Sequence, residues 1–539
     1  MSFDTLLTPE RIARETAAGY WTGKVITDFL DEHAASTPNK IAFVDSRREI
    51  TFADLKAEVD TVALGLRARG VAAGDVVSFQ LPNWIEWIVV HYAATRIGAI
   101  SNPLIPIYRE REVGFMVGMA KSKVIVVPRE FRGFDYPAMI AGLTSQWDFA
   151  PDLVVVGDDS WEELKEAGNT ARVEELASLR PDANDVTLLI FTSGTTGEPK
   201  GVMHTHNTMV AANNPLPERL GVGPDSVLHM ASTLAHLTGF LYGARLNVQN
   251  GATCVLQDVW DATTFVDLIE KHRITYTSAA TPFLHDLVSA PNLAARDTSS
   301  LVRFCCMGAP IPRTMVREAK EKLPGLVVVG GWGQSEEGLV TIGIPGDPEE
   351  KIIETDGYPW PGMEIRVVDA DGAVVASGIE GALQVRGPFV FVGYAERLEL
   401  TREQMVAADD DKGDWFDTGD LAFIDGDGYL RISGRTKDVI IRGGENIPVA
   451  YVENVLYEHP DVDAVAVVGV PDPRLQERAC ACLVMKPGTT MTFDEMKAFL
   501  ATKGVAKQYW PEKFVVLDDF PKTPSGKIQK FQLREQVSK

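Results

Sequence analysis

A polar, glycine-rich run is the segment of the sequence best suited to bind a phosphate group. It follows the apolar stretch 186–191 and reads Thr192-Ser193-Gly194-Thr195-Thr196-Gly197-Glu198-Pro199-Lys200-Gly201. Small residues let backbone N–H groups approach phosphate oxygens, the hydroxyls add further donors, and Lys200 adds a positive charge. The run is not a Walker A loop, because only Glu198 and Pro199 separate Gly197 from Lys200. We predict a phosphate-binding loop here, with a solvated polar turn as the alternative.

A second segment combines an aromatic ring, a hydroxyl and a carboxylate within a few residues. It follows an apolar run and reads Gly331-Trp332-Gly333-Gln334-Ser335-Glu336. These side chains suit a stacked base, a phosphate contact and a metal ion, respectively. The segment is not a serine-hydrolase elbow, because the second glycine, Gly338, falls one place late. Alone, this segment is weak support for a site.

Three charged segments near the end of the chain complete the candidate set. They read Asp417-Thr418-Gly419-Asp420, Gly434-Arg435-Thr436-Lys437-Asp438 and Pro521-Lys522-Thr523-Pro524-Ser525-Gly526-Lys527. The first two flank a predicted hairpin, so their charged groups are expected to cluster. The prolines of the third predict a rigid turn that presents Lys527, with an exposed, solvated tail lysine as the alternative.

The composition limits the kind of partner. The 539 residues predict two or more domains. Lysine and arginine number 52 and aspartate and glutamate 75, a net charge of −23, which disfavours nucleic acid and anionic lipid as main partners. An anionic ligand such as a nucleotide would therefore need a local pocket of N–H groups and a few placed cations.

Metal, disulfide and targeting features are scarce. The five cysteines include no CxxC pair, so we predict neither a disulfide framework nor a zinc site and expect a reducing compartment. His204 and His206 lack a third ligand nearby and are interpreted as polar contacts. Residues 1–20 lack the apolar core of a signal peptide, and the apolar stretch 84–107 is interrupted by charged residues and a proline. A cytoplasmic location is expected.

The elements that must position these residues form an α/β pattern. From Val25 to about Leu256, helical-period segments alternate with short β-branched runs, which predicts parallel sheets covered by helices. From about Met363 the strands shorten and Asp-x-Asp-Gly turns appear, which we interpret as hairpin turns rather than calcium loops. Beyond Gly434 we predict a helix near 450–458, a strand at 464–470 and a helix near 492–503. We expect a large N-terminal domain of parallel sheets with covering helices and a small β unit (residues 1–436), and a small, mobile α+β C-terminal domain (residues 437–539).

In this order and spacing, the segments resemble the adenylate-forming superfamily, which includes AMP-forming acyl-CoA synthetases, stand-alone adenylation enzymes and firefly luciferases. The resemblance spans nearly the whole chain, with Ser335 standing where the family more often has threonine. Residues 102–112 and 232–240 look most like cyclohexanecarboxylate and medium-chain fatty acid CoA ligases.

The resemblance implies an AMP-forming carboxylate–CoA ligase that uses ATP, Mg²⁺ and coenzyme A. It implies that Lys527, Ser335 and Glu336 are the catalytic residues, with Glu336 also contacting the metal. The nucleotide-binding residues implied are Thr192, Ser193, Gly194, Thr195, Thr196, Gly197, Lys200, Gly308, Ala309, Pro310, Trp332, Gly333, Gln334, Asp420 and Arg435.

The resemblance also implies a second conformation. The small domain would rotate about Lys437, withdraw Lys527 and bring in a coenzyme A tunnel formed by Gly443, Gly444 and Glu445. For the two glycines, a plain tight turn is the alternative.

The acyl-binding residues implied are Ala235, His236, Gly239, Met307 and Gly333. Acetate-specific members have a second tryptophan where this chain has Gly333. We therefore predict an open pocket floor at Gly333 and a medium-chain or alicyclic substrate.

Other functions remain as alternatives. The chain could be a stand-alone adenylation enzyme that loads a carrier-protein thiol. A catalytically silent nucleotide-binding regulator would require loss of Lys527 or Glu336, and both are present. The context of Lys527 resembles sites that protein acetyltransferases modify in related bacterial ligases. A protein acetyltransferase acting on Lys527 is therefore a candidate partner. A homo-oligomer is also among the alternatives.

Overall fold

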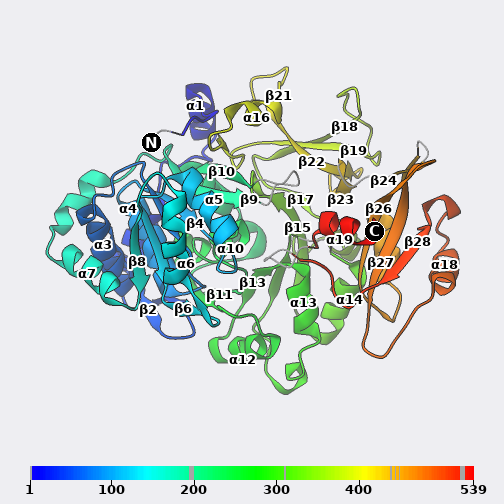
Figure 1. Ribbon diagram of the computed structural model, residues 1–539, viewed down its shortest axis with the longest axis horizontal. Coiled ribbons are helices and arrows are strands. Elements are labelled where there is room, and N and C mark those ends of the chain that lie inside the picture. Colours follow the sequence, from blue (N-terminus) through cyan, green and yellow to red (C-terminus); the bar gives the residue numbers. More distant parts are fainter. Residues whose placement is uncertain are drawn as a thin grey trace.

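The computed structural model describes residues 3–192, 199–308, 311–436, 440–442, 445–447, 449–522 and 528–538. Figure 1 shows the N-terminal α/β layers and, at the opposite end, the elements that follow residue 440. The fold is α/β with a large N-terminal part and a smaller C-terminal part, as predicted.

The first sheet has strands in the order β20-β10-β9-β4-β3-β5-β8. Its strands are β3 (Val76–Phe79), β4 (Ile100–Pro103), β5 (Val124–Pro128), β8 (Asp152–Val156), β9 (Val186–Thr192), β10 (Lys200–Thr205) and β20 (Gly393–Tyr394). The strands from β9 to β8 in this order are parallel, whereas β10 pairs antiparallel with both of its neighbours, β9 and β20. Val124 and Val126 pack in one apolar cluster and Ile125 and Val127 in another. Strand β5 is apolar throughout because both of its faces are buried.

The second sheet has the order β17-β16-β15-β14-β13-β11-β12-β1-β2. Its strands are β1 (Ile41–Val44), β2 (Glu49–Thr51), β11 (Val227–Met230), β12 (Thr253–Leu256), β13 (Tyr276–Ala279), β14 (Arg303–Cys306), β15 (Val327–Gln334), β16 (Gly338–Ile342) and β17 (Tyr358–Pro359). The strands from β15 to β1 in this order are parallel. At the two ends of the sheet, β2 pairs antiparallel with β1, β16 with β15, and β17 with β16. The predicted parallel sheets are confirmed.

The helices of the N-terminal part cover these sheets. They are α1 (Pro9–Ala17), α2 (Ile26–Ser36), α3 (Phe52–Ala68), α4 (Ile85–Arg96), α5 (Glu110–Ala120), α6 (Tyr136–Leu143), α7 (Asp159–Asn169), α8 (His206–Asn213), α9 (Leu216–Leu220), α10 (Leu237–Tyr242), α11 (Leu246–Asn250), α12 (Ala262–His272), α13 (Thr281–Val288), α14 (Arg313–Lys322), α15 (Glu349–Glu354) and α16 (Leu398–Glu403). A two-stranded ribbon, β6 (Glu130–Phe131) and β7 (Phe134–Asp135), precedes α6. The stretch 84–107 folds as α4 and β4 within the core.

A third, antiparallel sheet forms the predicted small β unit. Its strands are β18 (Glu364–Val368), β19 (Gly381–Arg386), β21 (Met405–Val406), β22 (Trp415–Ile424) and β23 (Leu430–Arg435). The β22–β23 hairpin is confirmed, and Asp425 accepts hydrogen bonds from the backbone N–H groups of Asp427 and Tyr429. The turn after β18 is also a tight reverse turn, with a backbone hydrogen bond from Asp369 to Ala373 and the bridge Val368–Val374, but the main strand partner of β18 is β19.

The C-terminal part forms a separate sheet with helices. Its elements are β24 (Ile440–Arg442), β25 (Glu445–Ile447), α17 (Val449–Tyr457), β26 (Val462–Asp472), β27 (Gln476–Met485), α18 (Phe493–Thr502), β28 (Lys513–Val516) and α19 (Lys530–Ser538). The two predicted helices and the predicted strand are confirmed as α17, α18 and β26.

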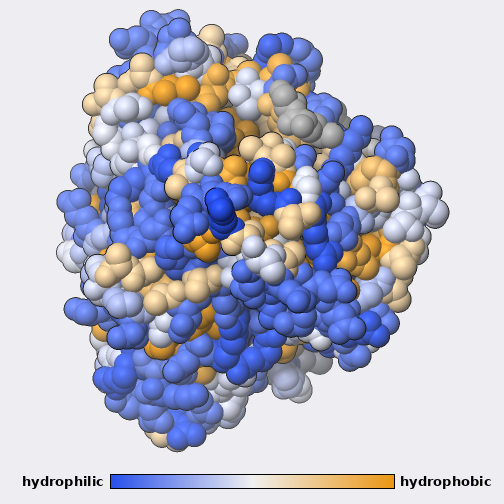
Figure 2. All heavy atoms as spheres, turned by 90° about the vertical axis from the view of Figure 1, so that its left-hand side faces the viewer, coloured by the Kyte–Doolittle hydropathy of each residue, from blue (hydrophilic) through white to orange (hydrophobic). Residues whose placement is uncertain are grey.

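Three features bear on the expectations from composition: the hydropathy of one face of the molecule, the length and polarity of the helices, and the state of the cysteines. The face that carries α3 and α7 is mostly hydrophilic, with scattered apolar spots (Figure 2). In the described ranges, every helix is too short or too polar to cross a membrane. All five cysteines are free thiols and buried.

Candidate active site

The predicted phosphate-binding loop connects two antiparallel strands. Thr192 at the end of β9 lies opposite Lys200 at the start of β10. Lys200 places its Nζ 4.6 Å from the ring centre of Tyr394, which lies beside Val202 at the edge of the same sheet. The ends of the loop are therefore fixed by strand pairing.

The aromatic, hydroxyl and carboxylate segment forms the β15–β16 hairpin. Gln334 pairs with Gly338, so Ser335, Glu336 and Glu337 form the turn. The backbone oxygen of Ser335 accepts a hydrogen bond of 2.7 Å from His204 Nε2. Strand pairing and this bond hold the turn against β10.

The Glu336 carboxylate is held by the first sheet. Its Oε1 accepts a hydrogen bond of 2.8 Å from the hydroxyl of Tyr394, and its backbone oxygen accepts one of 2.6 Å from the N–H of Phe391. The turn thus brings Glu336 to the strand edge that also positions Lys200.

A charged network adjoins this hairpin. Asp420 Oδ2 accepts hydrogen bonds from Trp332 Nε1 at 2.8 Å and from Gln334 Nε2 at 3.0 Å. Arg435 lies opposite Asp420 in the β22–β23 ladder and forms an ion pair with it, at 3.1 Å from Nε to Oδ1. The structure therefore brings these four predicted residues together.

Burial changes the protonation of the groups around the turn. Burial raises the pKa of Glu336, and the hydrogen bond from Tyr394 and the charge of Lys200 oppose this effect. Burial and the neighbouring Glu336 raise the pKa of Glu337 well above its usual value. Burial lowers the pKa of His204 to about 4, so this ring is neutral at pH 7 and carries its proton on Nε2, which faces a carbonyl.

Three of the predicted acyl-binding residues, Ala235, His236 and Gly239, lie at the start of α10, whereas Met307 and Gly333 belong to the second sheet and its loops. His236 is the N-cap of this helix and accepts a hydrogen bond from the Thr238 N–H at 3.4 Å. Ala235 and Met307 are buried, and Met307 follows β14. The segment before α10 is held by Asn83, which bonds to the backbone of residues 232 and 234.

The prediction of an open pocket floor at Gly333 is wrong. A Cβ at this position would lie 1.8 Å from the backbone oxygen of Gly338 and 2.8 Å from the Cα of Leu339. The missing side chain makes room for the facing strand, where the pairing shifts register, and not for a ligand. Gly239 is similarly enclosed, since its Cβ would lie 2.2 Å from the Thr233 oxygen. Gly308 differs, with φ +82° and nothing described within 4 Å of its Cβ position.

Several predicted site residues lie outside the described residues, or have no described side chain. Those outside are Ser193, Gly194, Thr195, Thr196, Gly197, Ala309, Pro310, Lys437, Gly443, Gly444 and Lys527. For Glu445 only the backbone, in β25, is described. Their roles remain predictions.

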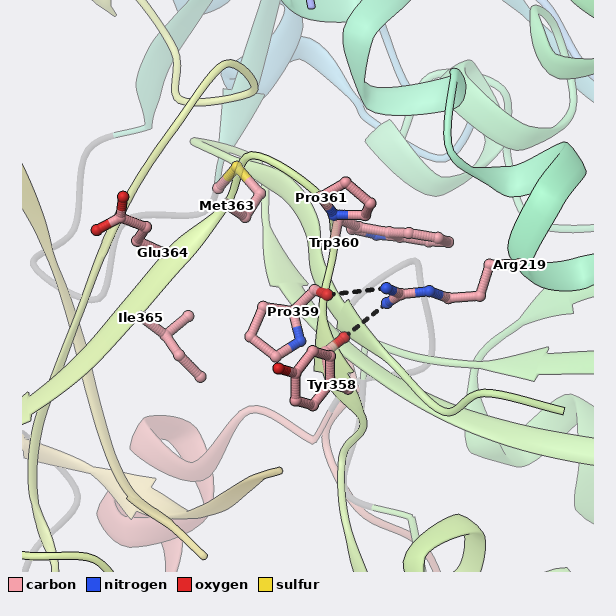
Figure 3. Close-up of a pocket in the computed structure, with 8 residues that line it drawn as sticks. All are labelled: Arg219, Tyr358, Pro359, Trp360, Pro361, Met363, Glu364 and Ile365. Atoms are coloured by element: carbon pink, nitrogen blue, oxygen red, sulfur yellow. Dashed lines mark hydrogen bonds between the residues drawn. The ribbon is translucent and has the colours of Figure 1, made fainter. Parts of the chain in front are cut away.

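A surface pocket of about 430 Å³ has none of the predicted site residues in its described lining (Figure 3). Arg219 donates to the backbone oxygens of Tyr358 and Pro359, both at 2.9 Å, and stacks 4.4 Å from the centre of the Trp360 ring. The guanidinium therefore holds the β17 segment in place.

Among the described residues, no group of three or more histidines, cysteines or carboxylates could hold a metal ion.

Sequence reasoning missed the residues that support the turn. Tyr394 and His204 contact residues 336 and 335 across 58 and 131 positions of sequence. Local pattern carries no information about such contacts. The interpretation of His204 as a polar contact is confirmed, and the structure adds its partner, the backbone oxygen of Ser335.

Comparison with known proteins agrees with the fold and with the predicted family. Residues 30–395 match the AMP-binding enzyme family, and residues 451–527 match the AMP-binding enzyme C-terminal domain. The chain is 35% identical to the medium-chain fatty-acid–CoA ligase of Escherichia coli K12, covering 98% of this chain and 93% of that protein. It is 31% identical to the human mitochondrial medium-chain acyl-CoA ligase ACSF2, covering 96% and 88%.

A solved structure of similar sequence has the same fold. The crystal structure of ATP-bound MatB from Rhodopseudomonas palustris superposes with a TM-score of 0.86 at 28% identity, covering 96% of this chain and 99% of that one. The family match covers most of the chain, and the relatives align over nearly their full length. The chain therefore belongs to the AMP-binding enzyme family, as an AMP-forming acyl-CoA synthetase.

Proposed function

We propose that the protein activates a medium-chain or alicyclic carboxylic acid to an acyl-adenylate and then transfers the acyl group to coenzyme A. The observation that carries this proposal is the β15–β16 turn, which contains Ser335 and brings Glu336 to the Tyr394 side chain that Lys200 also contacts. The names of the 35% and 31% identical relatives support the size of the acid.

In this proposal, residues of both parallel sheets bind ATP. Trp332 and the turn at Gly308 bracket the adenine, and no described atom lies within 4 Å of a Cβ position at Gly308. Asp420 and Arg435 hold the ribose hydroxyls. Residues 192–200 bind the β- and γ-phosphates, with Lys200 supplying a charge at the end of the loop.

The residues present suit Mg²⁺, which prefers oxygen ligands. Glu336 offers a buried carboxylate with one oxygen already oriented by Tyr394. The ion would neutralise phosphate charge that develops during the displacement. Ser335 would donate to the α-phosphate from the same turn.

The first half-reaction needs positioning more than proton transfer. The substrate carboxylate is ionised at neutral pH, so its oxygen attacks the α-phosphorus without a general base, and pyrophosphate leaves. Lys527 would bridge the carboxylate and the α-phosphate and stabilise the developing charge.

The second half-reaction uses the boundary between residues 436 and 437. Rotation about Lys437 would withdraw Lys527 and bring residues 443–445 to the acyl-adenylate. The thiol sulfur of coenzyme A then attacks the acyl carbon, AMP leaves, and the thiol proton passes to solvent.

A substrate panel tests the proposal. Pyrophosphate release would be measured with acetate, hexanoate, octanoate and cyclohexanecarboxylate, and the product identified by mass spectrometry with either coenzyme A or a pantetheinylated carrier protein as acceptor. We expect hexanoyl-, octanoyl- or cyclohexanecarbonyl-CoA as the main product. Pyrophosphate release with transfer only to the carrier would support the alternative, a carrier-loading enzyme. A preference for acetate would refute the substrate assignment.

A further inference from the structure

Tyr394 contacts two of the groups proposed to bind Mg·ATP. Its hydroxyl donates to Glu336 Oε1 at 2.8 Å, and the Nζ of Lys200 lies 4.6 Å from its ring centre. The first contact is a charge-assisted hydrogen bond and the second a cation–π interaction. One side chain therefore contacts the proposed metal-binding carboxylate with its polar end and a proposed phosphate-binding ammonium with its aromatic face.

The Tyr394 side chain has little freedom to move. The residue is buried, with 1% of its surface exposed, and its ring packs 4.8 Å from that of Phe391. Its backbone N–H donates to Thr401 Oγ1 at 2.9 Å, and β20 pairs with β10 through Val202. A phenol fixed in this way can orient a neighbour at no further entropic cost.

The neighbouring backbone connections make the arrangement one rigid unit. Phe391, three residues before Tyr394, donates its N–H to the backbone oxygen of Glu336. Ala395, the next residue, donates its N–H to the backbone oxygen of Gly201, which follows Lys200. The segment 391–395, which carries Tyr394, is thus hydrogen-bonded to the backbone of Glu336 and to that of Gly201, the neighbour of Lys200.

We propose that Tyr394 is a positioning residue that fixes the Glu336 carboxylate and the Lys200 ammonium relative to each other, so that the metal ion and the triphosphate bind as one unit. The inference rests on the proposed function, since it uses the assigned roles of Glu336 and Lys200. It predicts that removal of the hydroxyl and removal of the ring have different consequences.

Two variants separate these contributions. Tyr394→Phe loses the bond to Glu336 and keeps a ring beneath Lys200, whereas Tyr394→Leu loses both. Tyr136→Phe is the matched control. Tyr136 is also 1% exposed, and the substitution removes one hydrogen bond, of 2.7 Å, from its hydroxyl to the backbone oxygen of Pro106.

The decisive measurement is Mn²⁺ binding, followed by electron paramagnetic resonance with a non-hydrolysable ATP analogue and no acid. We expect Tyr394→Phe to bind Mn²⁺ about tenfold more weakly, because the Glu336 carboxylate is no longer oriented by the phenol and must be ordered when the ion binds. At saturating Mn²⁺ its affinity for the analogue should stay near that of the unmodified protein. Tyr394→Leu should weaken both. Thermal unfolding of Tyr394→Phe should match that of Tyr136→Phe.

Two outcomes would overturn the inference. One is Mn²⁺ binding by Tyr394→Phe that equals that of the Tyr136→Phe control. The other is an equal loss of Mn²⁺ and nucleotide affinity in both Tyr394 variants, which would indicate general damage to the site. The binding assay contains no acid or coenzyme A, so it decides the role of Tyr394 even if the unmodified protein fails to form the proposed acyl-CoA product.

Discussion

Gly333→Ala should damage the active site without changing the preferred acid. The added Cβ would lie 1.8 Å from the Gly338 oxygen, whereas real Cβ contacts are essentially never shorter than 3.0 Å. The facing atoms are backbone and cannot rotate away. The strands β15 and β16 must therefore separate at this position, next to the turn that carries Ser335 and Glu336.

The size of the effect follows from this displacement. Overpacking of a core costs about 1 to 3 kcal/mol when side chains can adjust, and here a hydrogen-bonded backbone must adjust, so we expect at least the upper end of that range. A shift of about 1 Å at reacting groups costs about 100-fold in rate. Adenylate formation should fall by at least this factor with every acid.

The assays are ATP–pyrophosphate exchange with acetate, hexanoate and cyclohexanecarboxylate, together with thermal unfolding. Gly142→Ala is the control, because nothing lies within 4 Å of its Cβ position on α6. The control should be at least as stable as the unmodified protein, because alanine is favoured over glycine in a helix, and should keep its rates. A Gly333→Ala protein with unchanged stability and a shift toward acetate would refute the reasoning, since Gly333 would then face the substrate.

Three further predictions concern the two parts of the chain. Lys527→Ala should slow adenylation by about 10² to 10³ and spare thioester formation from supplied acyl-AMP, and equal loss of both would contradict the two-conformation proposal. Lys437→Pro should fix φ near −65° and affect the two half-reactions unequally, as single-turnover rates would show. His285 bonds to Asp286 at 3.4 Å and lies 3.8 Å from Asp463 of the C-terminal part, and these contacts raise its pKa. The contact should therefore be strongest below pH 6.5 and weaken as pH rises through the raised pKa, a change that small-angle scattering should detect and His285→Asn should abolish.

The parallel sheets were predictable from the sequence because both of their faces are buried. Val124 and Ile125 enter different apolar clusters, so a continuous β-branched run is required. The β22–β23 turn was predictable because Asp425 bonds to nearby backbone within the turn itself. Such features depend on neighbours in sequence, which a pattern records.

The pocket floor could not be predicted in the same way. A glycine in place of a large residue is compatible with open space or with a close approach of backbone. At Gly333 the second applies, because β16 returns after a three-residue turn with a register shift. The role of Tyr394 was hidden for a related reason, since the distance in sequence from Glu336 gives no indication of their contact.

The charges around the turn explain how an acidic protein can admit an anionic nucleotide. Within the described part of the chain, both carboxylate oxygens of Glu337 are buried without a hydrogen-bond partner. Burial and Glu336 raise the pKa of Glu337 well above its usual value, which favours the neutral form of this carboxyl group. The charges of Glu336 and Asp420 are then offset by those of Lys200 and Arg435. With Glu337 in its neutral form, the turn is locally near neutral within a chain of net charge −23, and the loop N–H groups and a divalent cation would make it attractive to a triphosphate.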